Sequence, residues 1–290
     1  MMITAAALSG WLDAMPQALP LPVIPEGIAE PAKRADYLLE HFWDGFRSRV
    51  ITEEELAEFL SVFPHATEAG RKTGAEKLVA IVSGQGEEAV LRMERLIEGY
   101  LLDRRSPVRS DAAYVAFADA MIKAGWPGKA VAEYLRDMAL RCQVGSAAPD
   151  FRFVTSEGEV SLGETANGKR TLLLFYDPDC RECRELAGRM RAAVKIGESC
   201  GSGMLQVLAV RIPEDGEMGD GSVDSACASS TGVFATMEGE MPHGWISGCA
   251  IQDPGESLYA IPGLPALYLI SGDGTVELKD ASLDEVLSVI

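Results

Sequence analysis

Histidine is scarce in this sequence, and the cysteines form only one motif. The three histidines, His41, His65 and His243, are scattered, and a single Cys-x-x-Cys spacing occurs. A zinc site would need a second such pair or a pair of histidines, so we expect no bound metal. No apolar run reaches the ~18 residues that a membrane-spanning helix needs, so we expect no membrane span.

Basic residues are fewer than acidic residues in this sequence. The chain has 26 Lys and Arg against 44 Asp and Glu, which gives a formal net charge of −18. Such a surface repels phosphate backbones, so we expect no nucleic-acid partner. No Lys or Arg precedes Lys33, so the short apolar patch at the N-terminus lacks the charged start of a secretory signal, although its Ala-rich stretch could be a signal remnant.

The apolar content is sufficient for more than one core. The chain has 290 residues, 47% of them hydrophobic, and single cores stop growing at ~250–300 residues. Five prolines between residues 16 and 31 predict an extended arm over residues 1–30. From residue 31 to 144 the apolar residues recur at helical spacing, and Thr52 with Glu55 fits a capping box. We therefore expect an all-helical domain there.

The composition changes between residues 143 and 150, and strand-like and helix-like runs then alternate. The predicted elements are strands at 171–176, 205–212 and 266–270, a helix from Cys180 to about Val194, a hairpin turn at 272–274 leading into 275–279, and a last helix capped by Ser282. This order predicts a mixed sheet flanked by helices over residues 145–290.

The Cys-x-x-Cys pair lies where a predicted strand leads into a predicted helix. At a helix N-terminus the unpaired N–H groups and the dipole stabilise a thiolate by about 0.3–1 kcal/mol, or up to ~2 kcal/mol when it is partly buried. Cys183, one turn after Cys180, could attack a mixed disulfide at Cys180. This spacing indicates a redox-active disulfide that needs no other cofactor. Half a metal site or two packed thiols are the structural alternatives.

The charges around the pair are mixed. Arg181 would favour a thiolate at Cys180, whereas Asp179 and Glu182 would oppose it. These three residues are candidates for tuning the thiols. The sequence leaves open whether the pair would act as a reductase, an oxidant or an isomerase.

A second element accompanies the cysteines. Leu264 and Pro265 stand at the head of an apolar strand that a Gly-Asp-Gly turn follows. This pattern is similar to the cis-proline of thioredoxins, which faces the active-site disulfide and shapes the substrate groove. X–Pro bonds tolerate the cis form at ~0.5–1 kcal/mol. The alternative is an ordinary trans proline at the start of a strand.

Residues 145–290 resemble the thioredoxin-like proteins of bacterial envelopes, a group of thiol–disulfide oxidoreductases. The matching residues are Gly145, Ala148-Pro149-Asp150-Phe151, Gly158, Leu162, Gly168-Lys169, the apolar strand before Cys180, Cys180-Arg-Glu-Cys183 and Leu264-Pro265. The resemblance implies Cys180 as the attacking thiol, Cys183 as the resolving thiol, and protein thiols or disulfides and an upstream electron donor as partners. It implies the periplasm or cell envelope as the location, with the cytoplasm as the alternative.

Residues 31–142 resemble a helical domain of unknown function that precedes such domains in bacterial proteins. The matching segments are Arg34-Ala-Asp-Tyr-Leu, His41-Phe-Trp-Asp, and Tyr100-Leu-Leu-Asp with Ser106-Pro107. This resemblance implies no activity.

The sequence departs from the family pattern at three places. Asp179 replaces a tryptophan, Arg181-Glu182 replaces Gly-Pro, and Leu174 replaces the buried aspartate that assists proton transfer from the second cysteine. We therefore expect specialised exchange rather than general thioredoxin activity. The main alternative is a partner-binding or scaffold protein, and a peroxidase is disfavoured because the two cysteines suit a dithiol reductase.

The rest of the second half leaves several questions open. The long segment from 213 to 257 is either a substrate-facing insertion or a loop with one helix at about 225–237. Trp245 is expected to pack in the core, with the edge of the site as the alternative, and Cys142 is expected to pack in its helix. Any two of Cys200, Cys227 and Cys249 could pair.

Overall fold

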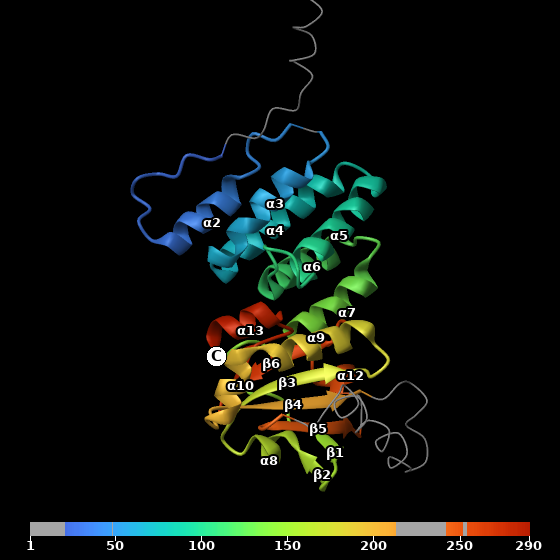
Figure 1. Cartoon of the computed structure of the whole chain (residues 1–290). Coiled ribbons are helices and arrows are strands. Elements are labelled where there is room, and N and C mark those ends of the chain that lie inside the picture. The colour runs from blue at the N-terminus through green and yellow to red at the C-terminus, as the bar shows by residue number, and fades with distance from the viewer. Residues whose placement is uncertain (1–20, 48, 213–241, 252–253) are drawn as a thin grey trace, which may run out of the picture. The chain divides into compact units, whose positions relative to one another are not determined.

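A computed structural model describes residues 21–47, 49–212, 242–251 and 254–290. Two compact units are present, Met1–Arg136 and Asp137–Ile290 (Figure 1). Most of the predicted N-terminal arm, the predicted helix at 225–237 and Cys227 lie outside the described residues. None of the described helices is long and apolar enough to cross a membrane.

The first unit is helical, as predicted. Its described elements are α2 (Pro31–His41), α3 (Glu53–Val62), the 3-10 helix η1 (Phe63–His65), α4 (Glu68–Ser83), α5 (Glu87–Leu102), α6 (Asp111–Ala124) and the first part of α7 (Lys129–Leu140). The predicted capping box is confirmed at α3: Thr52 Oγ1 accepts the N–H of Glu55 at 3.3 Å, and Glu55 Oε2 accepts the N–H of Thr52 at 3.1 Å.

Aromatic rings from several helices fill the interior of the first unit. Phe59, Phe63 and Phe117 are fully buried. The centroids of Phe59 and Phe63 lie 5.2 Å apart, and those of Phe63 and Phe117 lie 5.0 Å apart. Such edge and tilted contacts stabilise a core beyond the area that they bury.

The second unit contains a seven-stranded mixed sheet in the order β2-β1-β5-β4-β3-β6-β7. Its strands are β1 (Arg152–Thr155), β2 (Gly158–Ser161), β3 (Arg170–Tyr176), β4 (Leu205–Arg211), β5 (Trp245–Ala250), β6 (Ala266–Ile270) and β7 (Val276–Leu278). β3, β4 and β5 are parallel, while β6 is antiparallel to β3 and to β7. The three predicted strands and the hairpin after β6 are therefore confirmed.

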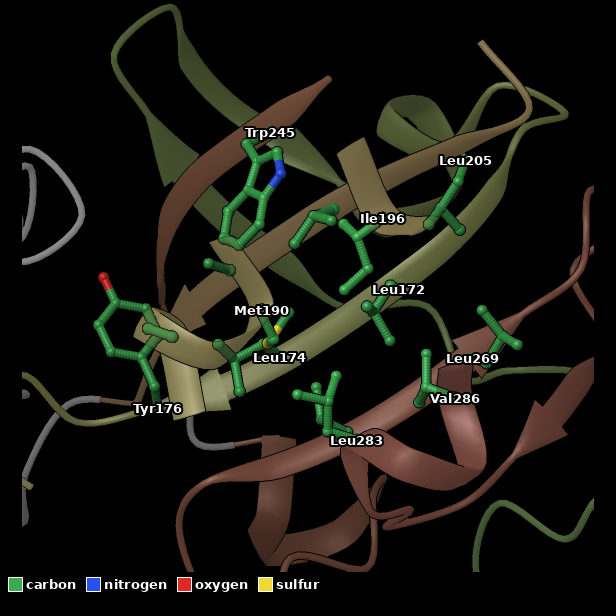
Figure 2. Close-up of a cluster of buried hydrophobic side chains, with 14 of the residues drawn as sticks. Leu172, Leu174, Tyr176, Met190, Ile196, Leu205, Trp245, Leu269, Leu283 and Val286 are labelled. Carbon is green, nitrogen blue, oxygen red and sulfur yellow. The ribbon is translucent and has the colours of Figure 1, made fainter. Parts of the chain in front are cut away.

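Both faces of the sheet are covered by apolar groups, because successive residues of a strand point to opposite sides. On one face, α9 (Arg181–Ala192), α10 (Val194–Gly201) and α13 (Leu283–Val289) pack on residues such as Leu174. Figure 2 shows Leu174 of β3 beside Met190 of α9 within this cluster. The cluster on the other face includes Leu162 from α8 (Leu162–Ala166) and Tyr259, just after α12 (Pro254–Ser257).

Several elements differ from the sequence prediction. The hairpin β1–β2 and strand β5 were not predicted, because β1 and β2 are only four residues long and β5 carries Ser247 and Gly248 at its centre. Cys142 does not pack within a helix as predicted: α7 ends at Leu140, and Cys142 adopts a left-handed backbone with φ 46°. Trp245 is buried in the core, as predicted.

Candidate functional site

The end of β3 and the start of α9 bring the two cysteines to the carboxyl edge of the parallel strands. β3 ends at Tyr176, the chain turns through Asp177, Pro178 and Asp179, and α9 begins directly after Cys180. Cys180 is the N-cap of this helix. Its position follows from an apolar strand that ends at an Asp-Pro-Asp turn, a sequence that favours chain reversal.

The sulfur of Cys180 takes part in the cap itself. Cys180 Sγ accepts the backbone N–H of Cys183 at 3.2 Å, and the backbone N–H of Arg184 bonds to the carbonyl of Cys180 at 3.3 Å. The unpaired N–H groups of a helix N-terminus favour negative charge. The backbone N–H of Cys183, which already donates a hydrogen bond to Cys180 Sγ, would therefore also stabilise a thiolate at Cys180.

Cys180 and Cys183 differ sharply in exposure. Cys183 is buried, whereas Cys180 is the one described cysteine that is not fully buried. Burial raises the pKa of Cys183 to about 12, a backbone hydrogen bond from Asp177 opposes this rise, and the hydrogen bond and charge of Cys180 add to it. Cys183 is thus a neutral thiol behind a more accessible sulfur, an arrangement that suits an attacking and a resolving cysteine.

Leu264 and Pro265 lie beside the cysteines because of the register of two strands. β6 pairs antiparallel with β3, and Phe175 stands opposite Ala266. The residues just before β6 therefore lie next to those just after β3. The Leu264–Pro265 peptide bond is cis, and the thiol of Cys180 lies 3.8 Å from the carbonyl oxygen of Leu264.

The charged residues around the pair engage one another or the backbone. Arg181 and Glu182 are exposed on the first turn of α9, and Arg181 Nε lies 2.8 Å from Glu185 Oε1. Asp179 is exposed, and its backbone N–H bonds to Asp177 Oδ1 at 2.7 Å. Arg181 is therefore partly neutralised by its own helix, which reduces its effect on Cys180.

Leu174 occupies the interior below the cysteines. It is fully buried and belongs to the same apolar cluster as Cys183. No carboxylate stands at that position, so any group that accepts the proton of Cys183 must lie elsewhere.

The other described cysteines are buried free thiols. Cys200 lies in α10 and Cys249 in β5, while Cys142 follows the end of α7. Among the residues that the structure describes, no three His, Cys, Asp or Glu side chains gather as a metal site would require.

The sequence reasoning overlooked Asp177. Its backbone carbonyl accepts the N–H of Cys180 at 3.3 Å, and its carboxylate accepts the N–H of Asp179. The signal was the Asp-Pro-Asp turn itself, because an aspartate before proline commonly hydrogen-bonds the backbone two residues on.

Comparisons with known proteins give a family match for the first half of the chain and a likeness of fold. Residues 3–139 match the model of a domain of unknown function, DUF5106. A thioredoxin-like protein from Bacteroides caccae has a similar structure, with a TM-score of 0.72 at 22% identity over 94% of this chain and 98% of that one. At this identity the likeness shows the fold.

Two further structures match about half of the chain. A conserved protein of unknown function from Bacteroides fragilis is 30% identical over 50% of this chain and 97% of its own, with a TM-score of 0.40. The thioredoxin domain of a thiol-disulfide oxidoreductase from Bacteroides vulgatus is 19% identical over 50% and 94%, with a TM-score of 0.39. No curated protein matches the sequence. The N-terminal half of the chain thus resembles a domain of unknown function, and the C-terminal half has the thioredoxin-like fold.

Proposed function

We propose that the chain is a thiol–disulfide oxidoreductase that exchanges disulfides with protein substrates through Cys180 and Cys183. The observation that carries the proposal is the pairing of an accessible sulfur at the N-cap of α9 with a buried thiol one turn later. A helix N-terminus stabilises the thiolate that must attack, and the buried thiol is protected until a mixed disulfide forms.

The proposed reaction has two steps. The thiolate of Cys180 attacks a substrate disulfide, so that a Cys180–substrate bond forms and one substrate thiolate leaves. Cys183 then attacks Cys180 Sγ, the intramolecular disulfide forms, and the second substrate thiolate leaves. The substrate gains two electrons and the protein loses two, so an upstream dithiol reductant must restore the pair.

Leu264 and Pro265 form the opposite side of the proposed site. The carbonyl of Leu264 lies 3.8 Å from Cys180 Sγ, so a substrate chain that reaches the sulfur also reaches this backbone. In this proposal the exposed residues Asp179, Arg181 and Glu182 set the charge of the surface around Cys180 that a substrate contacts. We place the substrates in the cell envelope, on the resemblance of residues 145–290 to envelope proteins.

Replacing the resolving cysteine tests this function. In a Cys183→Ser variant the second step is blocked, so mixed disulfides between Cys180 and substrate proteins should accumulate and should disappear on treatment with a reductant. A Cys180→Ser variant is the matched control and should form none. Equal adducts with both variants, or none with either, would contradict the proposal.

A second variant distinguishes an oxidoreductase from a scaffold protein. The double variant Cys180→Ala, Cys183→Ala keeps both folds but has no dithiol. Full biological activity of this variant would favour a partner-binding protein over an oxidoreductase.

A further inference from the structure

A shallow hollow lies on the outer face of α5 in the first unit. Its volume is about 340 Å³, which is at the lower end of the range for small-ligand sites. Residues of α5 line one side, and Glu53 at the start of α3 and the loop after α5 line the rest. Tyr100, Asp103, Ser106 and Pro107 of this lining belong to the segments through which the first half resembles a domain of unknown function.

Gly99 leaves the middle of this helix face without a side chain. The residue lies inside α5, and a Cβ at this position would meet nothing within 4 Å beyond its own stretch of helix. Glycine inside a helix is less stable than alanine, because its backbone loses more freedom on folding. Within the described residues no close packing requires a glycine here, so Gly99 lowers helix stability and keeps the hollow open.

The two acidic side chains of the hollow each lie beside an arginine. Arg105 donates from Nε and Nη2 to the two carboxylate oxygens of Asp103 at 3.2 and 3.1 Å, and these bonds hold the pKa of Asp103 below its usual value. Arg92 Nη2 lies 3.8 Å from Glu53 Oε1. The protein itself therefore compensates part of the negative charge of both carboxylates.

Arg95 and Tyr100 are the polar side chains of the lining that lack such partners. In the part of the chain that the structure describes, neither the Arg95 guanidinium nor the Tyr100 hydroxyl forms a hydrogen bond or an ion pair with another residue. At about 100° per residue the two stand some 140° apart around α5, with Gly99 between them. A ligand that lies over Gly99 can therefore reach both groups.

We propose that this hollow binds an apolar residue that ends in a carboxylate, as found at the C-terminus of a peptide or in an N-acylated amino acid. Arg95 holds the carboxylate through two parallel N–H donors, and the Tyr100 hydroxyl donates to the adjoining amide carbonyl. The apolar side chain lies over Gly99, against Leu96 and Pro107 of the lining. The site belongs to the unit to which the proposed function assigns no task, and it does not depend on the cysteine pair.

The charge of the lining favours a single carboxylate over a phosphate. One cation without a partner matches one negative charge, whereas a phosphate group carries about −1.5 to −2 at pH 7. The carboxylates of Glu53 and Asp103 would repel the additional charge. The net charge of −18 on the whole chain disfavours a multiply charged anion further.

NMR titration of the isotope-labelled full chain with N-acetyl-leucine tests the site. Signals of residues 95–103 should shift, with a Kd on the order of 0.1–1 mM at low salt, because the site is shallow and solvent screens its charges. N-acetyl-leucinamide is the matched ligand without the charge. It should bind about tenfold more weakly or less, since it forms no charge-assisted hydrogen bond.

Two variants remove the proposed donors. Arg95→Gln should weaken binding of N-acetyl-leucine by about tenfold or more, and Tyr100→Phe by about threefold to tenfold. Lys123→Gln is the control, because it removes the same charge from an exposed ion pair with Glu76 at 2.9 Å. The Kd of this control should stay within about twofold of wild type.

A third variant fills the hollow without weakening the helix. In Gly99→Leu the new side chain extends back over the preceding turn, towards Arg95. Leucine is also a better helix former than glycine. Binding of N-acetyl-leucine should therefore be lost, while the temperature of thermal unfolding stays at or above that of wild type.

A pentapeptide that ends in leucine, compared with its amidated form, distinguishes the two sources of the ligand. Tighter binding than N-acetyl-leucine assigns the site to a protein C-terminus, and equal or weaker binding assigns it to a small acylated amino acid. Three results would overturn the proposal: N-acetyl-leucine that binds no better than its amide or not at all, wild-type affinity in Arg95→Gln or Gly99→Leu, or tighter binding of inorganic phosphate at the same residues.

Discussion

The sulfur of Cys180 lies 3.8 Å from the carbonyl oxygen of Leu264, although 84 residues separate the two in the chain. The antiparallel pairing of β3 and β6 creates this contact, since Phe175 stands opposite Ala266. In this contact Cys180 is the N-cap residue of α9, and Leu264 takes part through its backbone carbonyl. The site is therefore built by the sheet register, and side chains can vary around it.

Because the contact uses the backbone of Leu264, loss of its side chain should affect stability more than reactivity. The half-buried Leu264 packs against both core clusters of the second unit. We expect Leu264→Ala to lower the free energy of unfolding by about 1–3 kcal/mol. The rate at which iodoacetamide labels Cys180 should stay within about threefold of wild type, since the carbonyl remains. A large change in labelling with unchanged stability would show that the side chain controls the sulfur.

Leu174 should act through packing alone. It is fully buried between β3 and the helices that cover it, so Leu174→Ala should reduce the free energy of unfolding by about 2–5 kcal/mol. The exposed Val194 on α10 provides a control, because Val194→Ala should cost less than about 0.5 kcal/mol. Denaturant unfolding of the three proteins measures both effects, and similar losses for the two variants would refute the packing argument.

The elements that carry the candidate site could be predicted from sequence, because each has a strong local signal. β3 is a run of apolar residues, α9 follows a turn, and Ser282 caps α13 with a capping box. β5 was missed because its central Ser247 and Gly248 break the apolar pattern, and its place beside β4 depends on long-range pairing. The difference in exposure between Cys180 and Cys183 also depends on how β3 and α9 meet in space, which the spacing of the two cysteines does not give.

Acid should weaken the first unit through Glu55. This buried carboxylate receives Arg49 Nη1 at 2.7 Å and a second bond from Nη2, and these bonds hold its pKa below the ordinary 4.5 against the opposing effect of burial. A carboxylate whose pKa is lower in the folded than in the unfolded state stabilises the fold at pH values above its unfolded-state pKa. This stabilisation is lost as the pH falls through the folded-state pKa. We expect Glu55→Gln, which keeps the capping box, to cost roughly 1–2 kcal/mol at pH 7.

The difference in the free energy of unfolding between wild type and Glu55→Gln should shrink as the pH falls below about 4.5, the ordinary pKa of glutamate. Glu53→Gln is the control, because Glu53 is 58% exposed and lies 3.8 Å from Arg92. Thermal unfolding from pH 3 to pH 7 measures the difference. A constant difference over this range would show that the charge of Glu55 does not matter.

Alkali should weaken the second unit through Cys142. Burial raises the pKa of this thiol from 9.0 to about 11, although Lys279 and Arg141 lower it in part. A thiol whose pKa is higher in the folded than in the unfolded state contributes its full stabilisation below the unfolded-state pKa. This stabilisation is lost as the pH rises through the folded-state pKa. The stability advantage of wild type over Cys142→Ala should therefore be constant below about pH 9 and decline towards pH 11.

Urea unfolding of the reduced proteins between pH 7 and pH 11 measures this decline. Cys200→Ala is a useful comparison, because burial raises the pKa of Cys200 as well, so its curve should fall in the same direction. An advantage of wild type over Cys142→Ala that grows with pH would contradict the effect of burial on Cys142.

A redox titration of the Cys180–Cys183 pair tests the proposed function most directly. The full chain is equilibrated with glutathione or dithiothreitol buffers over a range of potentials, and the free thiols of Cys180 and Cys183 are trapped and counted by mass spectrometry. We expect one reversible two-electron transition that Cys183→Ser abolishes, at about −270 mV for a thioredoxin-type reductant or about −120 mV for an oxidant. Two thiols that titrate independently, or that never form a reversible disulfide, would contradict the proposal.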